Sequence, residues 1–226
     1  FGRIKRRILT FGTHEDANVR ILESIQENLG SRFRLQYNSD ERLECTLQLP
    51  GEHNVLNAAA AFAATYEMGV DPKIIAKGLG SFGGVERRFQ VKATEPYVVV
   101  DDYAHHPTEV RATLAAARSA GFRRILAAFQ PHRYSRTFHL FEDFVHAFDD
   151  ADVVLIADIY PAGESPIEGV TSTQLVERLR LAGKSEAYHV PKIEEMEAFF
   201  RQHVRSGDAI LIMGAGNITV LADRLS

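Results

Sequence analysis

The sequence lacks a second cysteine, a long apolar run and an excess of charge of one sign. With Cys45 as the single cysteine, an intramolecular disulfide is excluded and a reducing compartment fits best. No apolar run approaches the ~20 residues of a membrane-spanning helix. The 26 basic and 30 acidic residues give a net charge of −4 and form no basic stripe. We therefore expect a cytoplasmic protein that binds neither membrane nor nucleic acid.

The composition is that of an ordinary globular protein, with 45% hydrophobic and 25% charged residues. The 226 residues suffice for one large domain or two small ones. The chain begins at Phe1 without a methionine and runs directly into a strand-like pattern. We therefore expect it to be a fragment of a larger protein.

The first fifty residues show short segments that alternate with period two, a pattern typical of strands. Three segments are expected to be strands: 8–11, 32–37 and 42–49. A polar turn at 38–41 predicts a hairpin between the last two. The segment 16–29 is ambiguous between strand and helix, and strand is favoured. Cys45 lies in an alternating run and is expected to be a buried structural thiol.

Two helices are expected next. Residues 55–68 form an alanine-rich segment with strong helix propensity, for which Asn54 is the expected N-cap. Asp71 and Pro72 begin a second helix that continues to residue 79. The glycine-rich segment 80–85 is expected to be a flexible exit from this helix.

From residue 97 onward the sequence predicts alternating strands and helices. The expected strands are 98–101, 124–129, 153–157, 186–189 and 209–213. The expected helices are 108–120, 140–148, 172–182, 193–205 and 218–225. Five successive β–α units predict an α/β domain with a Rossmann-like parallel sheet and helices on both faces. The segment 90–96 has no strong pattern, so we expect two domains, residues 1–91 and 92–226.

Ligands of open α/β sheets bind beyond the carboxyl ends of the strands, so the loops after the expected strands are the places to look. Arg133 and Arg136 lie three residues apart in one such loop, with His132 beside them. Two guanidinium groups suit a carboxylate or a phosphate, since each can hold two oxygens at once. A solvated basic loop is the alternative.

Asp101, Asp102, His105 and His106 follow the strand expected at 98–101. Carboxylates and imidazoles are metal ligands, but no zinc-type spacing is present, and we expect no metal site here. We favour an aspartate that accepts hydrogen bonds from a hydroxylated ligand such as a ribose, with a histidine beside it. The alternative is that Asp102 caps the following helix.

Asn54 and Asn57 lie three residues apart at the start of a helix, next to His53. Side-chain amides both donate and accept, so they can recognise a purine edge, while capping and packing are the alternatives. Arg87 and Arg88 follow the glycine-rich segment. A loop arginine there can reach a phosphate, although adjacent arginines are commonly solvated.

Two further loops carry weaker signals. Gly214 and Gly216 predict a tight strand-to-helix turn, with anion binding as the less favoured interpretation. Glu164 and Glu168 are expected in a loop, where they could recognise an amine, although plain surface charge is favoured.

Six motifs occur in a fixed order along the chain. They are GEHNVLNA at 51–58, RRFQ at 87–90, DDYAHHPTE at 101–109, FQPHRYSRT at 129–137, DIYPAGE at 158–164 and MGAG at 213–216. As an ordered set they resemble the Mur ligase family, and within it the members that add L-alanine. The resemblance covers essentially the whole chain.

The resemblance implies a three-domain parent protein. Residues 1–91 would be the C-terminal portion of its central ATP-binding domain, and residues 92–226 its C-terminal Rossmann-like domain, which binds the amino acid. The family's Gly-Lys-Thr phosphate loop is absent from this sequence, as are the magnesium-binding acid and histidine that follow it. We therefore expect Mg²⁺ ligands mainly outside this chain, and a fragment that is inactive alone.

The resemblance also implies the reaction and its residues. The reaction is ATP-dependent joining of L-alanine to UDP-N-acetylmuramic acid through an acyl phosphate, a step of peptidoglycan synthesis. Asn54 and Asn57, beside His53, would contact the adenine, Asp102 the ribose and Arg88 the terminal phosphate. His105 would line the nucleotide site. The alanine carboxylate and the intermediate would be held by four residues: Tyr103, His132, Arg133 and Arg136. The alternatives are a sister ligase that reattaches a recycled tripeptide, and a non-catalytic nucleotide-binding module.

Overall fold

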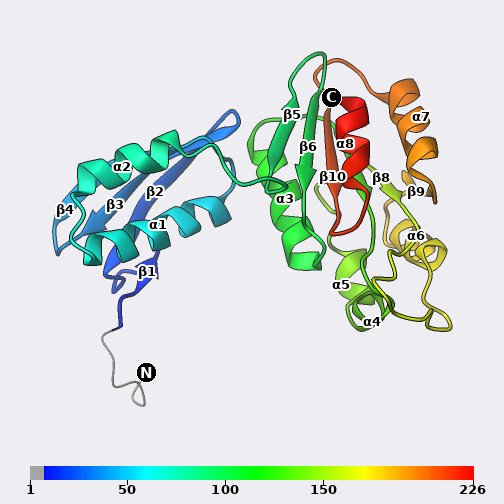
Figure 1. Ribbon diagram of the computed structural model, residues 1–226, viewed down its shortest axis with the longest axis horizontal. Coiled ribbons are helices and arrows are strands. Elements are labelled where there is room, and N and C mark those ends of the chain that lie inside the picture. Colours follow the sequence, from blue (N-terminus) through cyan, green and yellow to red (C-terminus); the bar gives the residue numbers. More distant parts are fainter. Residues whose placement is uncertain (1–7) are drawn as a thin grey trace. The chain divides into compact units, whose positions relative to one another are not determined.

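The structure is a computed structural model that describes residues 8–226 (Figure 1). It is an α/β protein whose chain divides into two compact units, Phe1–Gly83 and Gly84–Ser226. The division therefore comes earlier than the expected one after residue 91. The reason is β5 (Gln90–Ala93), which pairs antiparallel with β6 (Val98–Asp102) and so belongs to the sheet of the second unit.

The first unit contains a four-stranded sheet in the order β1-β2-β3-β4. Its strands are β1 (Phe11–Gly12), β2 (Val19–Glu27), β3 (Gly30–Tyr37) and β4 (Glu41–Leu47). β1 runs parallel to β2, and the other neighbours are antiparallel. The hairpin and the strand in the ambiguous segment are confirmed. The strand expected at 8–11 begins only at Phe11.

Two helices, α1 (Glu52–Glu67) and α2 (Pro72–Ser81), pack on this sheet. Phe33 and Leu35 of β3 meet Phe62 of α1 in a common core. Cys45 belongs to the same core, as expected of a structural thiol. The burial of these apolar side chains is what holds the two helices on the sheet.

The two helix starts differ in how well the sequence predicted them. Asp71 caps α2 as expected, because its carboxylate accepts from the backbone N–H of Lys73 at 2.8 Å. Asn54 is not the N-cap of α1. The helix begins at Glu52, after Gly51 turns the chain with a φ of 99°. The Asn54 amide instead donates from Nδ2 to the carbonyl oxygen that precedes this turn, at 2.8 Å.

The second unit contains a six-stranded sheet in the order β5-β6-β10-β7-β8-β9. The remaining strands are β7 (Ile125–Phe129), β8 (Val153–Ile156), β9 (Ala187–His189) and β10 (Ala209–Met213). All pair in parallel except β5, an antiparallel edge that the sequence did not suggest. Every residue of β6, β7, β8 and β10 is buried, as is typical of parallel strands covered on both faces.

Helices cover both faces of this sheet (Figure 1). They are α3 (Pro107–Ser119), α4 (Tyr134–His139), α5 (Phe141–Val145), α6 (Ser172–Leu181), α7 (Ile193–His203) and α8 (Thr219–Leu225). Met196 of α7 and Leu221 of α8 share a core cluster with Leu126 and Ala128 of β7. Phe129 points to the opposite face, where its ring packs against that of Phe144 in α5, with the ring centroids 5.3 Å apart. The expected Rossmann-like sheet is confirmed, while α4 was not expected.

The carboxyl ends of the central strands lie at one edge of the sheet. Met213 is in register with Asp102 on β6 and with Phe129 on β7, and Phe129 is in register with Ile156 on β8. The loops that carry the predicted site residues therefore leave the sheet from this edge. Within residues 8–226, no helix is long and apolar enough to cross a membrane.

Candidate functional site

Asp102, at the end of β6, is a buried carboxylate that ties neighbouring backbone segments together. Its Oδ2 accepts from the backbone N–H of Phe89 at 2.8 Å, and its Oδ1 accepts from that of Ala104 at 2.8 Å. Burial raises the pKa of Asp102, and these two hydrogen bonds oppose the rise. Asp102 does not cap α3. The N-cap is His106, whose Nδ1 accepts from the N–H of Thr108 at 3.3 Å.

His105 is held by its own loop. Its Nδ1 lies 2.8 Å from the carbonyl oxygen of Tyr103, and because a carbonyl oxygen can only accept, Nδ1 carries a proton. Glu109 accepts from the backbone N–H of His105 at 3.0 Å and lies 3.3 Å from the same Nδ1. Burial acts to raise the pKa of Glu109, but this hydrogen bond and the His105 charge bring it below the ordinary value. The orientation of the His105 ring is therefore fixed at one nitrogen, which leaves Nε2 for other contacts.

His132 follows β7 and packs between two rings. It stacks on Tyr160 with centroids 5.5 Å apart and meets the ring of His105 edge-on at 5.9 Å. Arg136 donates from Nη1 to Nδ1 of His132 and to its carbonyl oxygen, both at 3.1 Å. Burial and then the charge of Arg136 hold the pKa of His132 below 6.5. The ring is therefore neutral near pH 7.

Arg133 lies at the start of α4 with a left-handed φ of 73° and a half-exposed side chain. Glu164, from the loop after β8, accepts from the N–H and the hydroxyl of Ser135 at 2.9 and 2.7 Å. Its Oε1 lies 3.8 Å from Nη1 of Arg133. The two hydrogen bonds from Ser135 hold the pKa of Glu164 below its usual value. Glu164 thus anchors the arginine loop and is not simply a surface charge.

The predicted site residues of the second unit form a connected group. The guanidinium of Arg88 lies 5.9 Å from the ring centroid of Tyr103, and that ring lies 5.1 Å from the ring of His105. His105 contacts His132, which in turn holds Arg136. Cationic and hydrogen-bonding groups from three loops thus meet at the carboxyl edge of the sheet. Such a group suits an anionic ligand.

The remaining predicted residues lie in the first unit, on the first two turns of α1. They are His53, Asn54 and Asn57. Asn54 is half-buried and uses its Nδ2 in the hydrogen bond to Pro50. Asn57 is exposed on the same helix, three residues further on. The two amides are therefore on one face, as their spacing predicted, and their adenine contact stays a prediction.

Gln130 is a site residue that the sequence did not reveal. It is buried at the end of β7, donates from Nε2 to Asn217 Oδ1 at 2.9 Å and accepts at Oε1 from the N–H of Ile218 at 3.3 Å. A Cβ on Gly216 would lie 2.2 Å from that Oε1. The tight turn between β10 and α8 is thus confirmed, and Gln130 fastens it to the next strand. The signal in the sequence was a polar residue that closes an apolar strand.

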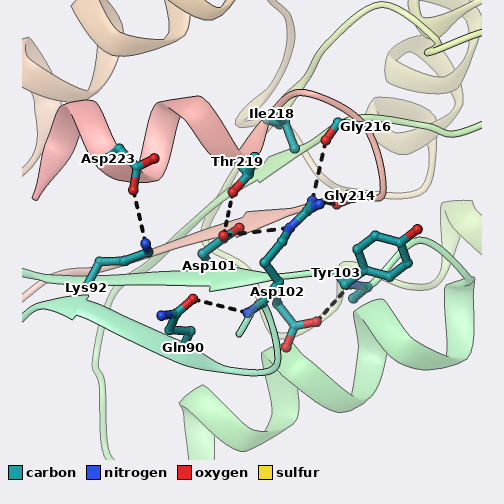
Figure 2. A network of polar contacts seen from close by, with 12 residues as sticks. Gln90, Lys92, Asp101, Asp102, Tyr103, Gly214, Gly216, Ile218, Thr219 and Asp223 are labelled. Atoms are coloured by element: carbon teal, nitrogen blue, oxygen red, sulfur yellow. Dashed lines mark hydrogen bonds and ion pairs between the residues drawn. The ribbon is translucent and has the colours of Figure 1, made fainter. Parts of the chain in front are cut away.

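Asp101 fastens the same turn from the other side (Figure 2). Its side chain is 1% exposed, and Oδ2 accepts from the hydroxyl of Thr219 at 2.6 Å. Arg87 places Nε 3.8 Å from this Oδ2 and donates from Nη2 to the carbonyl oxygen of Gly214 at 2.5 Å. Burial raises the pKa of Asp101, and the bond from Thr219 opposes the rise. Asp101 is therefore an internal anchor of this turn.

Family models match both parts of the chain. The model described as "Mur ligase middle domain" matches residues 2–65, and "Mur ligase, glutamate ligase domain" matches residues 87–216. The second match alone covers more than half of the chain. Its start at residue 87 also agrees with the observed division after Gly83.

Two curated relatives that match the chain carry the same name. The chain is 44% identical over 223 residues to a UDP-N-acetylmuramate–L-alanine ligase of Geotalea daltonii, covering 98% of this chain and 49% of that protein. It is 45% identical to the protein of that name from Geobacter sulfurreducens, covering 96% and 47%. The chain thus spans about half the length of the curated relatives it matches.

Solved structures agree in fold. A UDP-N-acetylmuramate–alanine ligase of Thermotoga maritima superposes with a TM-score of 0.80 at 31% identity, over 96% of this chain and 46% of that one. A murein peptide ligase of Psychrobacter arcticus gives a TM-score of 0.63 at 23% identity, over 96% and 45%. The second likeness is one of fold alone.

Proposed function

The chain belongs to the Mur ligase family, and on that premise we propose that it forms the C-terminal half of an ATP-dependent ligase that joins L-alanine to UDP-N-acetylmuramic acid. The observation that carries the proposal is the cationic group at the carboxyl edge of the second sheet, where Arg136 and His132 meet His105 and Tyr103. The substrates in this proposal are taken from the names of the relatives. A cytoplasmic location is part of the same proposal.

The nucleotide contacts proposed for the second unit differ in how well they fit. Arg88 is exposed, and the bond of His105 to Tyr103 uses Nδ1 and not Nε2. Both side chains could therefore contact a polar ligand. Asp102 is 6% exposed and already accepts from two N–H groups. A carboxylate has further lone pairs, so a ribose hydroxyl would have to donate to one of these. Asn54, Asn57 and the neighbouring His53 would contact the adenine from the first unit.

Mg²⁺ does not fit the residues at hand. Within residues 8–226, no three His, Cys, Asp or Glu side chains are grouped in a way that could hold a metal ion. We therefore assign no step to a metal bound by this chain. Under this proposal, the Mg²⁺ ligands of the active ligase lie outside this chain, in a region that corresponds to the uncovered half of its relatives.

The amino acid would be held by its carboxylate. Arg133 is half exposed, and Arg136 has five N–H donors, of which the bonds to His132 use one nitrogen. A guanidinium fork and the Nε2–H of His132 together suit the two oxygens of one carboxylate. Tyr103 would contribute its ring and hydroxyl beside them.

The proposed reaction needs the reactants aligned and the charge neutralised. ATP, when bound, would supply its terminal phosphoryl group to an oxygen of the muramoyl carboxylate; the bond to the neighbouring phosphate breaks, ADP is released, and an acyl phosphate forms. The alanine amine then forms a bond to the carbonyl carbon, the bond from that carbon to the phosphate oxygen breaks, and phosphate and a proton leave. Arg88 would stabilise the charge on the transferred phosphoryl group, and the arginine loop would orient the amine.

The direct test uses the full-length gene product that contains this sequence. We expect phosphate release from ATP to require both UDP-N-acetylmuramic acid and L-alanine, with a product heavier by one alanine residue. Release that requires a muramyl tripeptide in place of L-alanine would identify the recycling sister ligase. Nucleotide binding without release under either condition would identify a non-catalytic module.

The same protein tests the role of the arginine loop. We expect Arg133→Ala to raise the KM for L-alanine while the KM for ATP stays nearly constant. Arg111→Ala, an exposed arginine on α3, is the matched control. An unchanged KM for L-alanine and an unchanged rate in Arg133→Ala would overturn this assignment.

A further inference from the structure

Arg88 lies between two neighbours that both have a left-handed backbone. Arg87 has a φ of 57° and Phe89 a φ of 45°, a conformation that non-glycine residues adopt only when other contacts enforce it. The adjacent aspartates at the end of β6 provide those contacts. Asp101 pairs with the side chain of Arg87, and Asp102 accepts from the N–H of Phe89.

Arg87 is the more heavily anchored of the two neighbours. Its backbone N–H donates to Gln90 Oε1 at 3.1 Å, and its carbonyl oxygen accepts from the N–H of Tyr103 at 2.7 Å. Its guanidinium lies 4.8 Å from the ring centroid of Tyr103 and donates to the carbonyl oxygens of Gly214 and Gly216 at 2.5 and 3.4 Å. One side chain thus joins the loop before β5 to the loop after β6 and to the turn after β10.

The other side of this network is just as closely held. Figure 2 shows the carboxylate of Asp101 pointing toward Thr219, whose hydroxyl donates to it. Lys92, two residues beyond Gln90, pairs with Asp223 of α8 at 3.0 Å. β5, β6 and α8 are therefore fixed to one another by polar contacts. The only exposed member of the segment from Arg87 to Phe89 is Arg88 itself.

We propose that Arg87, paired with Asp101, is a positioning residue that holds the backbone of Arg88 in place for its contact with the transferred phosphoryl group. The inference rests on the proposed function for what Arg88 does, but not for how Arg88 is held. A guanidinium is required because a planar fork reaches two carbonyl oxygens and a carboxylate while it covers a ring. A lysine ammonium at position 87 keeps the charge but cannot make these contacts together.

The chain offers a matched control. Arg124 pairs with the buried Asp208 at 2.8 Å, and these residues directly precede β7 and β10, at the opposite edge of the sheet. The side chains of Arg87 and Arg124 are 26% and 27% exposed, and those of Asp101 and Asp208 are 1% and 6% exposed. Arg87→Lys and Arg124→Lys therefore disturb ion pairs of equal burial, and one of the pairs lies far from the site.

The experiment measures kinetics in the full-length protein. We expect Arg87→Lys to lower kcat by at least about tenfold with less than about a threefold change in the KM for L-alanine, because the lost contact acts in the transition state. Arg124→Lys should keep kcat within about twofold of wild type even where its Tm falls equally. Combining Arg87→Lys with Arg88→Lys should lower kcat little further than Arg88→Lys alone. Equal kcat in both single variants, or fully multiplicative losses in the double variant, would overturn the proposal.

A second readout does not depend on the reaction. Hydrogen exchange followed by mass spectrometry should show faster exchange in the peptides around Phe89 and Tyr103 in Arg87→Lys, and no such change in Arg124→Lys. Thr219→Val, which removes only the hydroxyl that binds Asp101, should give the same pattern with a smaller change. Unchanged exchange around Tyr103 in Arg87→Lys would overturn the positioning role even if the wild-type protein proves not to be a ligase. If exchange is faster in Arg87→Lys but the wild-type protein has no ligase activity, the positioning role is supported and only the proposed function is contradicted.

Discussion

Arg136 donates a hydrogen bond from Nη1 to Nδ1 of His132 across 3.1 Å, and this contact determines which nitrogen of the imidazole carries the proton. A guanidinium has only donors, so Nδ1 must accept, and the neutral ring then carries its proton on Nε2. His105 has the opposite arrangement, with its proton on Nδ1 toward the carbonyl oxygen of Tyr103. His132 is thus suited to donate to an oxyanion or a carboxylate at Nε2.

We expect Arg136→Gln to raise the pKa of His132 toward 6.5, because it removes the largest charge that opposes protonation of the ring. A histidine whose folded pKa is lowered contributes stability above its unfolded pKa, and this contribution is lost as the pH falls through the folded pKa. The variant should therefore lose less stability between pH 7 and pH 5 than wild type. An NMR titration of the imidazole resonances of His132 measures the shift directly.

Two controls accompany this titration. Arg133→Gln should raise the pKa of His132 by less, because Arg133 is the weaker of the two arginine contributions. Arg111→Gln, an exposed arginine on α3, should leave it unchanged. A midpoint in Arg136→Gln no higher than in Arg111→Gln would contradict the assigned hydrogen bond.

Glu164→Gln should loosen the start of α4. The carboxylate accepts from both the N–H and the hydroxyl of Ser135, whereas an amide offers only one oxygen for the two donors. We expect the Ser135 amide to exchange faster with solvent in Glu164→Gln. Glu168→Gln, an exposed carboxylate in the same loop, is the matched control. Equal exchange in the two variants would mean that Glu164 does not hold the loop.

The pH dependence of stability checks the same contact. The folded pKa of Glu164 is lowered, so its contribution is present above the ordinary value of 4.5 and is lost as the pH falls through the folded pKa. Glu164→Gln should therefore flatten the fall in the free energy of unfolding below pH 4.5. A slope equal to that of wild type in this range would contradict the prediction.

The regular elements of the second unit could be predicted because their signals are local. Each parallel strand is a short apolar run, and each long helix has its own periodic pattern. β5 and α4 could not be found in this way. β5 is a four-residue edge that depends on pairing with β6, and the start of α4 depends on Glu164, which lies 29 residues beyond Ser135.

The residues of the candidate site could likewise be predicted only where their signal in the sequence is local. Arg133, Arg136 and His132 could be identified because guanidinium and imidazole groups gathered after one strand suggest an anion site. The burial of Asp102 and the anchoring role of Arg87 could not be predicted from the sequence, because both depend on partners far along the chain. Arg87 donates to Gly214 across 127 residues. Only the folded sheet brings such residues into contact.

Cys45 should be inert in the folded protein. Burial raises the pKa of its thiol to about 12, and its side chain is 2% exposed. The thiolate is the reactive form, so at pH 8 we expect labelling by a disulfide reagent to be at least ~1000-fold slower in the folded than in the unfolded chain. Because the folded pKa is raised, the thiol's contribution to stability falls only as the pH rises above 9. Rapid stoichiometric labelling without denaturant would contradict the buried position.

Gly216→Ala tests whether the turn between β10 and α8 is as closely packed as the structure indicates. A Cβ at this position would lie 2.2 Å from Gln130 Oε1 and 2.9 Å from the ring of Tyr160. Gln130 is buried and would have to give up its hydrogen bonds to Asn217 and Ile218. We expect a loss of about 1–3 kcal/mol in the free energy of unfolding, the usual cost of leaving such groups unpaired.

The glycine in α2 provides the comparison for this variant. A Cβ on Gly78 would have nothing within 4 Å, so Gly78→Ala should be neutral or stabilise its helix by up to about 1 kcal/mol. Because Tyr160 stacks on His132, Gly216→Ala should also shift the imidazole resonances of His132, whereas Gly78→Ala should not. Calorimetry and the NMR titration described for Arg136 measure the two effects separately. If Gly216→Ala is as stable as Gly78→Ala and leaves His132 undisturbed, then Gln130 does not fasten this turn, and the carboxyl edge of the sheet is less rigid than its hydrogen bonds imply.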